Sequence, residues 1–155
     1  MCEWRAGPAA WQALLVTEPA DDDAQSDLVS DAVTQGIRVR VRSQFLPEHS
    51  NPRERRWAFS YTVSITNEGS EAATLLARHW VITDANNNIE HVRGPGVVGY
   101  QPHLAGGQSF TYTSGAILRT PHGLMQGEYT MERADGSRFD ASIAPFALAT
   151  PESIH

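Results

Sequence analysis

A regular alternation of apolar and polar residues near the middle of the sequence constrains the fold most strongly. From position 57 to 65 every second residue is large and apolar, in the order Trp57, Phe59, Tyr61, Val63 and Ile65. A period of two places these side chains on one face of an extended strand, whereas a helix would scatter them around its axis. The pattern predicts a β-strand with one buried face, ended by a turn at residues 67–70.

The same alternation, interrupted by turn residues, recurs along most of the chain. A strand is expected over residues 34–42, with Ile37, Val39 and Val41 on one face and Arg38, Arg40 and Arg42 on the other. Further strands are expected over residues 73–84, 89–93, 109–116, 129–133 and 138–148. Residues 86–88, 106–107, 120–123 and 135–136 supply the turns and loops between them.

About seven to eight short strands without a helical stretch predict an all-β fold, in which two antiparallel sheets stack as a β-sandwich. The immunoglobulin or fibronectin type III class is the expected architecture. A jelly roll or a small barrel is the alternative, because alternation alone does not determine which strands pair. The 155 residues of the chain are enough for one such domain.

Charge divides the chain into a head, a body and a tail. Residues 1–29 hold six of the 18 acidic residues but one of the 12 basic ones, and they are expected to form a loosely ordered extension. Residues 30–150 are the expected domain, and residues 151–155 a short C-terminal tail. A single cysteine, no export signal and no apolar run of roughly 20 residues predict a cytoplasmic protein that does not bind membranes.

Three glycines in the spacing GxGxxG stand out between residues 93 and 102. This spacing binds a dinucleotide when it follows a strand and opens a helix, because the amides at the helix N-terminus hold the pyrophosphate. Pro102 and the glycine pair at 106–107 exclude that helix. The segment remains a candidate ligand or partner loop through Arg93, Gly94, Gly96, Gly99 and Gln101. Its amides either cradle a phosphate or only turn the chain.

Three histidines at twelve-residue intervals, His79, His91 and His103, are weak candidates for metal ligands. The tight spacings typical of metal sites, such as HxH, HExxH or CxxC, do not occur in the sequence, and strand-and-turn units produce such intervals by themselves. The sequence also has no GxSxG elbow and no recognisable pair of catalytic carboxylates. It therefore predicts no resident metal, no cofactor and no enzymatic activity, and its neutral body argues against nucleic-acid binding.

Several short motifs follow one another in a characteristic order: Gly36–Val39, Arg78–Trp80, Ile82–Asp84, Val92–Gly99, Gln101–Pro102, Phe110–Ser114, Thr120–Tyr129 and Phe139–Asp140. Through these motifs the chain resembles the ApaG family, also called CorD or DUF525. The resemblance covers about residues 31–148 and is specific because many separate matches occur in the same order. The head is longer than bacterial members of the family usually carry.

The resemblance implies a fibronectin type III-like β-sandwich. Bacterial members are linked to cobalt and magnesium homeostasis without a settled activity, and their glycine motif has been discussed as a nucleotide or pyrophosphate site. Gly94, Gly96 and Gly99 carry over as that motif. In eukaryotes, similar domains are appended to larger proteins and look like protein-interaction modules.

Residues and resemblance together predict a non-enzymatic binding module that presents residues 93–102 to an unknown protein partner. Nucleotide or polyphosphate binding through the glycine motif is the alternative, and direct binding of a divalent cation is the second alternative. Pairing of two copies through exposed sheet edges also stays open.

Overall fold

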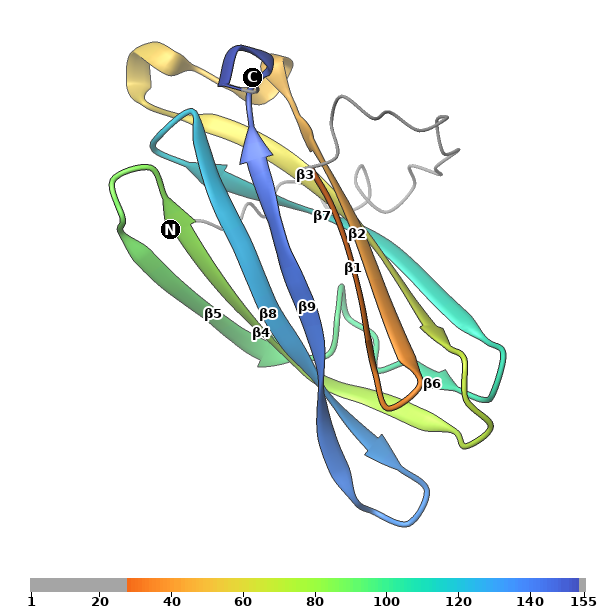
Figure 1. The fold of residues 1–155 in the computed structure, drawn as a ribbon. Coiled ribbons are helices and arrows are strands. Elements are labelled where there is room, and N and C mark those ends of the chain that lie inside the picture. The colour runs from red at the N-terminus through yellow and green to blue at the C-terminus, as the bar shows by residue number, and fades with distance from the viewer. Residues whose placement is uncertain (1–27, 154–155) are drawn as a thin grey trace.

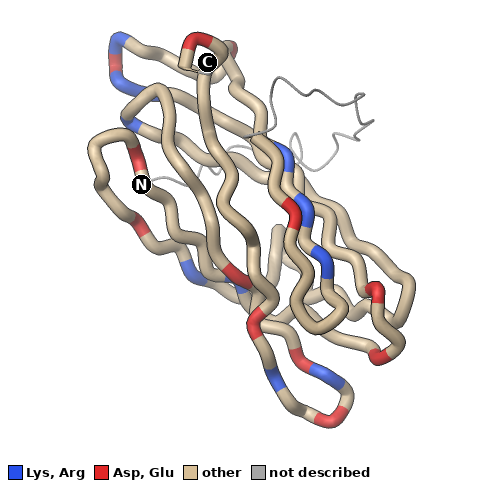
Figure 2. Tube along the Cα trace, viewed as in Figure 1, with Lys and Arg blue, Asp and Glu red and all other residues tan. Residues whose placement is uncertain are grey.

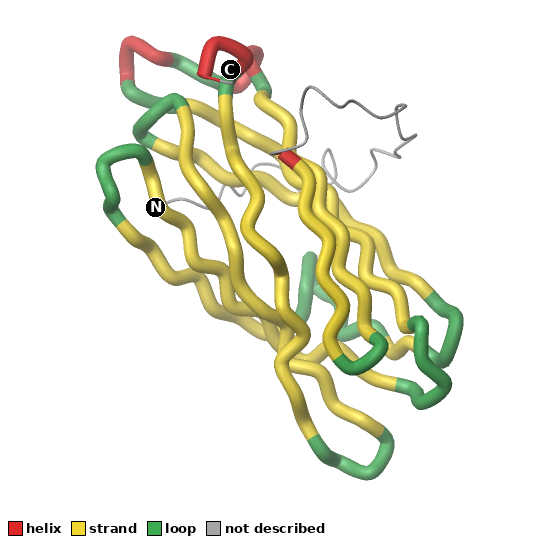
Figure 3. The backbone as a smooth tube through the Cα atoms, viewed as in Figure 1, coloured by secondary structure: helices red, strands yellow, loops and turns green. Residues whose placement is uncertain are grey.

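The computed structural model describes residues 28–153, in which two antiparallel sheets stack face to face (Figures 1 and 3). The first sheet has the strand order β1-β2-β3-β7. The second has the order β5-β4-β8-β9, and β6 also pairs with β4. This arrangement confirms the predicted two-sheet β-sandwich. The expected loosely ordered head lies, apart from its last two residues, outside the described range.

The first sheet consists of β1 (Val29–Thr34), β2 (Ile37–Phe45), β3 (Trp57–Asn67) and β7 (Ser109–Leu118). The second consists of β4 (Ala73–Asp84), β5 (Ile89–Pro95), β6 (His103–Leu104), β8 (His122–Arg133) and β9 (Arg138–Ala149). Short 3-10 helices occur at η2 (Pro47–His49), η3 (Pro52–Glu54) and η4 (Pro151–Ser153).

The core lies between the sheets and is built from the alternating positions. Phe59, Tyr61, Val63 and Ile65 of β3 are at most 2% exposed. Trp80 of β4 faces them. Its ring packs in edge-to-face geometry against the rings of Tyr61, Tyr129 and Phe146, with centroids 5.1 to 6.2 Å apart. Period two therefore predicted the buried face of β3 from Phe59 to Ile65, whereas Trp57 is only partly buried and Ala58, on the opposite face, is fully buried. Burial of the large rings is a main source of stability.

The strand expected over residues 34–42 is β2, which begins at Ile37 and buries Ile37, Val39 and Val41 as predicted, whereas Thr34 ends a separate strand, β1, that was not predicted. Gln35 and Gly36 both have positive φ, of 47° and 83°, and they join β1 to β2 in a tight antiparallel hairpin. Two consecutive residues with positive φ match the right-handed twist of a two-residue hairpin. β1 begins at Val29, one residue before the domain boundary expected at residue 30.

Several other strand boundaries also differ from the expectation. The strand expected over residues 129–133 is longer, because β8 already begins at His122, where it pairs with β9, and the loop expected at residues 120–123 therefore ends earlier. The two-residue strand β6 was not predicted, since two residues carry no recognisable period. β5 continues through Arg93 to Pro95 and so includes the first glycine of the motif.

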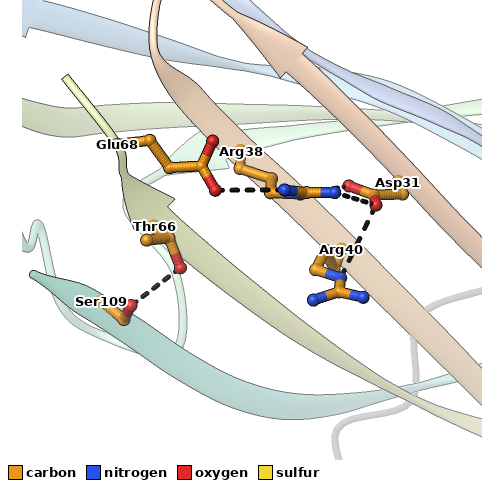
Figure 4. A network of polar contacts seen from close by, with 6 residues as sticks. All are labelled: Asp31, Arg38, Arg40, Thr66, Glu68 and Ser109. Carbon is orange, nitrogen blue, oxygen red and sulfur yellow. Dashed lines mark hydrogen bonds and ion pairs between the residues drawn. The ribbon is translucent and has the colours of Figure 1, made fainter. Parts of the chain in front are cut away.

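The arginine face of β2 is partly neutralised by neighbouring carboxylates. Arg38 donates to Asp31 at 2.8 and 2.7 Å and to Glu68 at 3.2 Å (Figure 4). Arg40 lies 3.7 Å from the same Asp31 carboxylate. The hydrogen bond from Arg38 holds the pKa of Asp31 below its usual value. Figure 2 shows basic positions along β2 beside an acidic position on β1.

None of the described elements is a helix long and apolar enough to span a bilayer.

Candidate functional site

The glycine loop, residues 93–102, leaves and rejoins one edge of β4. β5 pairs with β4 from Ala77 onward, β6 pairs with it at Ala73 and Thr74, and a bulge in β4 lies between the two (Figure 1). At the bulge the Gly96 amide donates to the Leu76 carbonyl at 2.8 Å. The loop is thus an excursion between two strands that share one edge, and it is anchored where that edge is irregular.

A two-residue turn closes the tip of the loop. The amides of Val97 and Tyr100 each donate to the other's carbonyl at 2.8 Å. Val98 and Gly99 between them have φ of 41° and 88°, as in a type I′ turn. Val97 is fully buried in the core. The β-branched Val98 rarely adopts a positive φ, so this turn depends on the packing of Val97 to hold it.

Arg78 of β4 braces the loop from inside the sandwich. Its Nη1 donates to the carbonyls of Pro95 and Gly96 at 3.2 and 3.1 Å. A Cβ on Gly94 would lie 3.0 Å from the same guanidinium, so this glycine leaves room for Arg78. The side chain of Gln101 is also committed, because its Nε2 donates to the Leu76 carbonyl at 2.9 Å. Much of the loop's polar backbone is therefore used within the protein.

Replacing Arg78 by glutamine is expected to loosen the loop and to lower the free energy of unfolding by about 2 kcal/mol, since two hydrogen bonds from a charged donor are lost. Urea unfolding measures the stability, and hydrogen exchange at the amides of Gly96 and Tyr100 measures the loop. Arg78→Lys keeps the charge without the forked donor and should recover only part of the loss. Unchanged exchange at both amides in Arg78→Gln would contradict the bracing role.

A shallow cleft of about 450 Å³ opens beside the loop. It is lined by Tyr100, Gln101, Pro102, His103, Leu104, Gln108, Ser109 and Phe110. Tyr100 comes from the loop and Phe110 from β7 of the other sheet, and their ring centroids are 5.9 Å apart. Tyr100 is 58% exposed although it is a large aromatic residue. The cleft thus combines an exposed aromatic ring with polar side chains, as is common in recognition surfaces.

The candidate residues from the sequence occupy two places. Gly96, Gly99 and Gln101 belong to the loop beside the cleft, whereas Arg93 is exposed on β5 in register with His79. Exposed and less exposed residues alternate along β5, so Arg93 points to the outer face of the second sheet, away from the core-packed Val92. Sequence proximity had grouped Arg93 with the loop, but strand pleating separates their side chains.

Two of the three histidines come together. His79 Nε2 lies 2.9 Å from His91 Nδ1, and His79 Nδ1 lies 2.9 Å from Glu128 Oε2. His103 is elsewhere, with its Nδ1 2.8 Å from the Thr74 hydroxyl. Among residues 28–153, no group of three or more histidine, cysteine or acidic side chains is arranged to hold a metal ion.

A buried pair of tyrosines links the sheets near Arg78. The hydroxyls of Tyr112 on β7 and Tyr129 on β8 share a hydrogen bond in the core. Burial raises the pKa of both hydroxyls above the usual value, and the positive charge of Arg78 offsets part of the rise. Both tyrosines are therefore held in the protonated form.

Stability is expected to fall at high pH because of this pair. Below about pH 10 the folded and unfolded chains both keep the two protons. Above it the unfolded chain releases them while the folded chain does not, so the free energy of unfolding falls by about 1.4 kcal/mol per pH unit for each tyrosine. Denaturant unfolding between neutral pH and pH 11 measures the slope. Tyr112→Phe should reduce it, and an unchanged slope would count against the assignment; Tyr100→Phe is the exposed control.

Sequence reasoning missed Arg78, Tyr100 and Phe110 as parts of this site. One signal was available, because Arg78 alternates with Trp80 and Ile82 and so is a charged residue at a core-facing position. The pairing of Tyr100 with Phe110 had no comparable signal. These residues meet across two sheets, and only the tertiary fold brings them together.

Comparison with known proteins agrees with this fold. A family model described as ApaG domain (DUF525) matches residues 47–133. "Protein ApaG" of Anaeromyxobacter dehalogenans strain 2CP-C is 54% identical over 127 residues, which are 82% of this chain and all of the relative. "Protein ApaG" of Stenotrophomonas maltophilia is 51% identical over the same shares of both chains.

Solved structures also resemble the chain. The crystal structure of a putative ApaA protein from Bordetella pertussis has a TM-score of 0.73 at 46% identity, and covers 76% of this chain and 95% of that one. An X-ray structure of another structural genomics target has a TM-score of 0.74 at 44% identity, and covers 80% and 94%. With the family model and these relatives in agreement, the chain belongs to the ApaG-domain family.

Proposed function

We propose that this chain is a non-enzymatic binding module whose protein partner docks on the cleft beside the glycine loop. The observation that carries the proposal is Tyr100, 58% exposed at the rim of the cleft on a turn closed by two backbone hydrogen bonds. A large aromatic side chain held in place by a rigid turn loses little conformational entropy on binding. Tyrosine is accordingly enriched at the centres of protein interfaces.

The hydrogen bonds within the glycine loop also support docking of a protein on the cleft. Gly96 and Gln101 are engaged with β4, and Arg78 holds two loop carbonyls. What the cleft offers to a partner is therefore mainly side chains, namely the rings of Tyr100 and Phe110 and the side chains of His103 and Gln108, each of which already makes one hydrogen bond within the protein. An apolar centre with polar surroundings is the composition expected of a protein-binding patch.

Site-specific photo-crosslinking in cells tests the proposal. A photoreactive phenylalanine analogue at position 100 is compared with the same analogue at position 124, where Leu124 is exposed on the second sheet. We expect position 100 to capture one defined protein, which excess unlabelled chain displaces, and position 124 to capture none. Equal capture at both positions, or none at position 100, would contradict docking at the cleft.

Nucleotide or polyphosphate binding is the second candidate, and the exposed guanidinium of Arg93 favours it. An arginine matches the geometry of phosphate oxygens and loses little hydration on binding them. Calorimetric titration with ATP, GTP and dinucleoside polyphosphates separates the two candidates. Binding much tighter than millimolar that Arg93→Gln abolishes would support the phosphate ligand, whereas absent binding would remove it.

A further inference from the structure

Three side chains form a continuous hydrogen-bonded chain across the outer face of the second sheet. Glu128 on β8, His79 on β4 and His91 on β5 belong to three adjacent strands. The two contacts, Glu128 Oε2 to His79 Nδ1 and His79 Nε2 to His91 Nδ1, are both 2.9 Å. The His79 side chain is 18% exposed, the Glu128 side chain 41% exposed, and His91 is exposed at the solvent end.

The carboxylate determines where the protons lie along this chain. An ionised Glu128 only accepts hydrogen bonds, so Nδ1 of His79 carries a proton and donates it. In neutral His79, Nε2 is then a bare acceptor, and His91 must donate to it through Nδ1. Neutral His91 is consequently left with an unprotonated Nε2, on a residue exposed to solvent.

The ring geometry shows that this is an in-line contact between ring edges. The two ring planes differ by 14° and the centroids are 5.2 Å apart, while the facing nitrogens are 2.9 Å apart. Since the atoms of face-stacked rings stay about 3.5 Å apart, the shorter contact means that the rings meet through their edges. The lone pair of His79 Nε2 thus faces the N–H of His91 and is placed to accept its proton.

Arg93 adds a positive charge on the same face. It pairs in register with His79 and follows His91 by two positions on β5, so the side chains of His91 and Arg93 project to the same side. An exposed nucleophilic nitrogen with a base behind it and an arginine on the same face of the sheet suits an electrophile that carries negative charge. A phosphoryl group has this character, and arginine is well matched to its oxygens.

We propose that His91 is a phosphoryl-accepting histidine, with His79 as its general base, Glu128 holding His79 in position, and Arg93 binding the incoming phosphoryl oxygens. The donor is an acyl phosphate or phosphoramidate. The lone pair of His91 Nε2 forms the N–P bond, and the bond from phosphorus to the leaving group breaks with its electron pair. The Nδ1 proton of His91 passes to His79 Nε2, and Glu128 stabilises the resulting imidazolium. The proton is then released to solvent or to the leaving group.

The test is chemical phosphorylation of the intact protein by phosphoramidate and by acetyl phosphate, with the modified histidines located by peptide mapping under non-acidic conditions. His103 is the internal control, because its Nδ1 faces the Thr74 hydroxyl. We expect His91 to react at least about tenfold faster than His103, as positioned proton transfer commonly contributes more than that. Equal rates at His91 and His103 in the unmodified protein would overturn the proposal.

Variants distinguish the effect of the Glu128–His79–His91 chain on the reaction rate at His91 from the effect of solvent exposure alone. Glu128→Gln can still accept from His79 but carries no charge, so it should bring the rate at His91 close to that at His103. The ratio of two rates within one molecule would not change if Glu128 were only structural. Arg93→Gln should slow the reaction at His91, whereas Arg53→Gln, a matched exposed arginine on η3, should leave it unchanged. A ratio unaffected by Glu128→Gln, or equal effects of the two arginine variants, would contradict the assigned roles.

Discussion

Gly127→Ala is expected to lower the free energy of unfolding by at least about 4 kcal/mol, enough to leave little folded protein at ordinary stability. Gly127 of β8 lies opposite Trp80 of β4 in the second sheet. A Cβ at this position would overlap the carbonyl oxygen of His79 and lie 3.1 Å from His79 C and Trp80 Cα. The added Cβ would clash with backbone atoms of β4, which pairs with β8 in the centre of the sheet, so rotation of a side chain cannot relieve the clash.

Soluble yield and urea unfolding measure this effect, with Gly136→Ala as the matched control. Gly136 lies in the hairpin between β8 and β9 and has a φ of 87°, but a Cβ there meets nothing within 4 Å. Its replacement should cost about 1 kcal/mol from the backbone conformation alone. Similar stabilities for the two alanine variants would contradict the close approach of the β8 backbone to the β4 backbone at Gly127.

Gly96→Ala is expected to have the second largest effect, lowering the free energy of unfolding by about 3 kcal/mol. Two costs combine at this position. The φ of Gly96 is 61°, where an L-residue is strained, and a Cβ would overlap the Tyr100 carbonyl oxygen that closes the turn. The substitution should therefore open the two-residue turn and release Val97 from the core.

Gly99 provides the comparison within the same motif. Its φ is 88°, but a Cβ there would meet nothing within 4 Å, so Gly99→Ala should cost only about 1 kcal/mol. Urea unfolding ranks the two variants, and limited proteolysis within residues 96–101 reports opening of the loop. Equal losses of stability, or a loop that remains protease-resistant in Gly96→Ala, would be inconsistent with the turn described here.

The bounds of β3 and β4 were predictable because their signals were local. Both strands run over the residues expected from period two and from the turn residues that flank them. The division between β1 and β2 was not predicted, because Gln35 is not a typical turn residue. Gln35 and Gly36 nevertheless both have positive φ and form the hairpin turn. Local composition therefore identified most strands but not each place where the chain reverses.

The site was harder to predict because it depends on pairing register and on contacts between sheets. The sequence identified the glycine loop, but not that Arg78 braces it or that Tyr100 meets Phe110 across the sandwich. Equal twelve-residue spacing of the histidines suggested one group of three. Strand register instead brings His79 to His91 and places His103 beside Thr74. Spacing along a chain gives no register, and register decides which side chains meet.

The most direct test of docking at the cleft is the affinity of the protein captured through position 100, measured for the unmodified chain, Tyr100→Ala and Leu124→Ala. Both residues are exposed and apolar, but only Tyr100 lines the cleft. The proposal predicts that Tyr100→Ala weakens binding at least about tenfold, as expected for an aromatic anchor, and that Leu124→Ala leaves it unchanged. Unchanged affinity in Tyr100→Ala, or an equal loss in both variants, would contradict it.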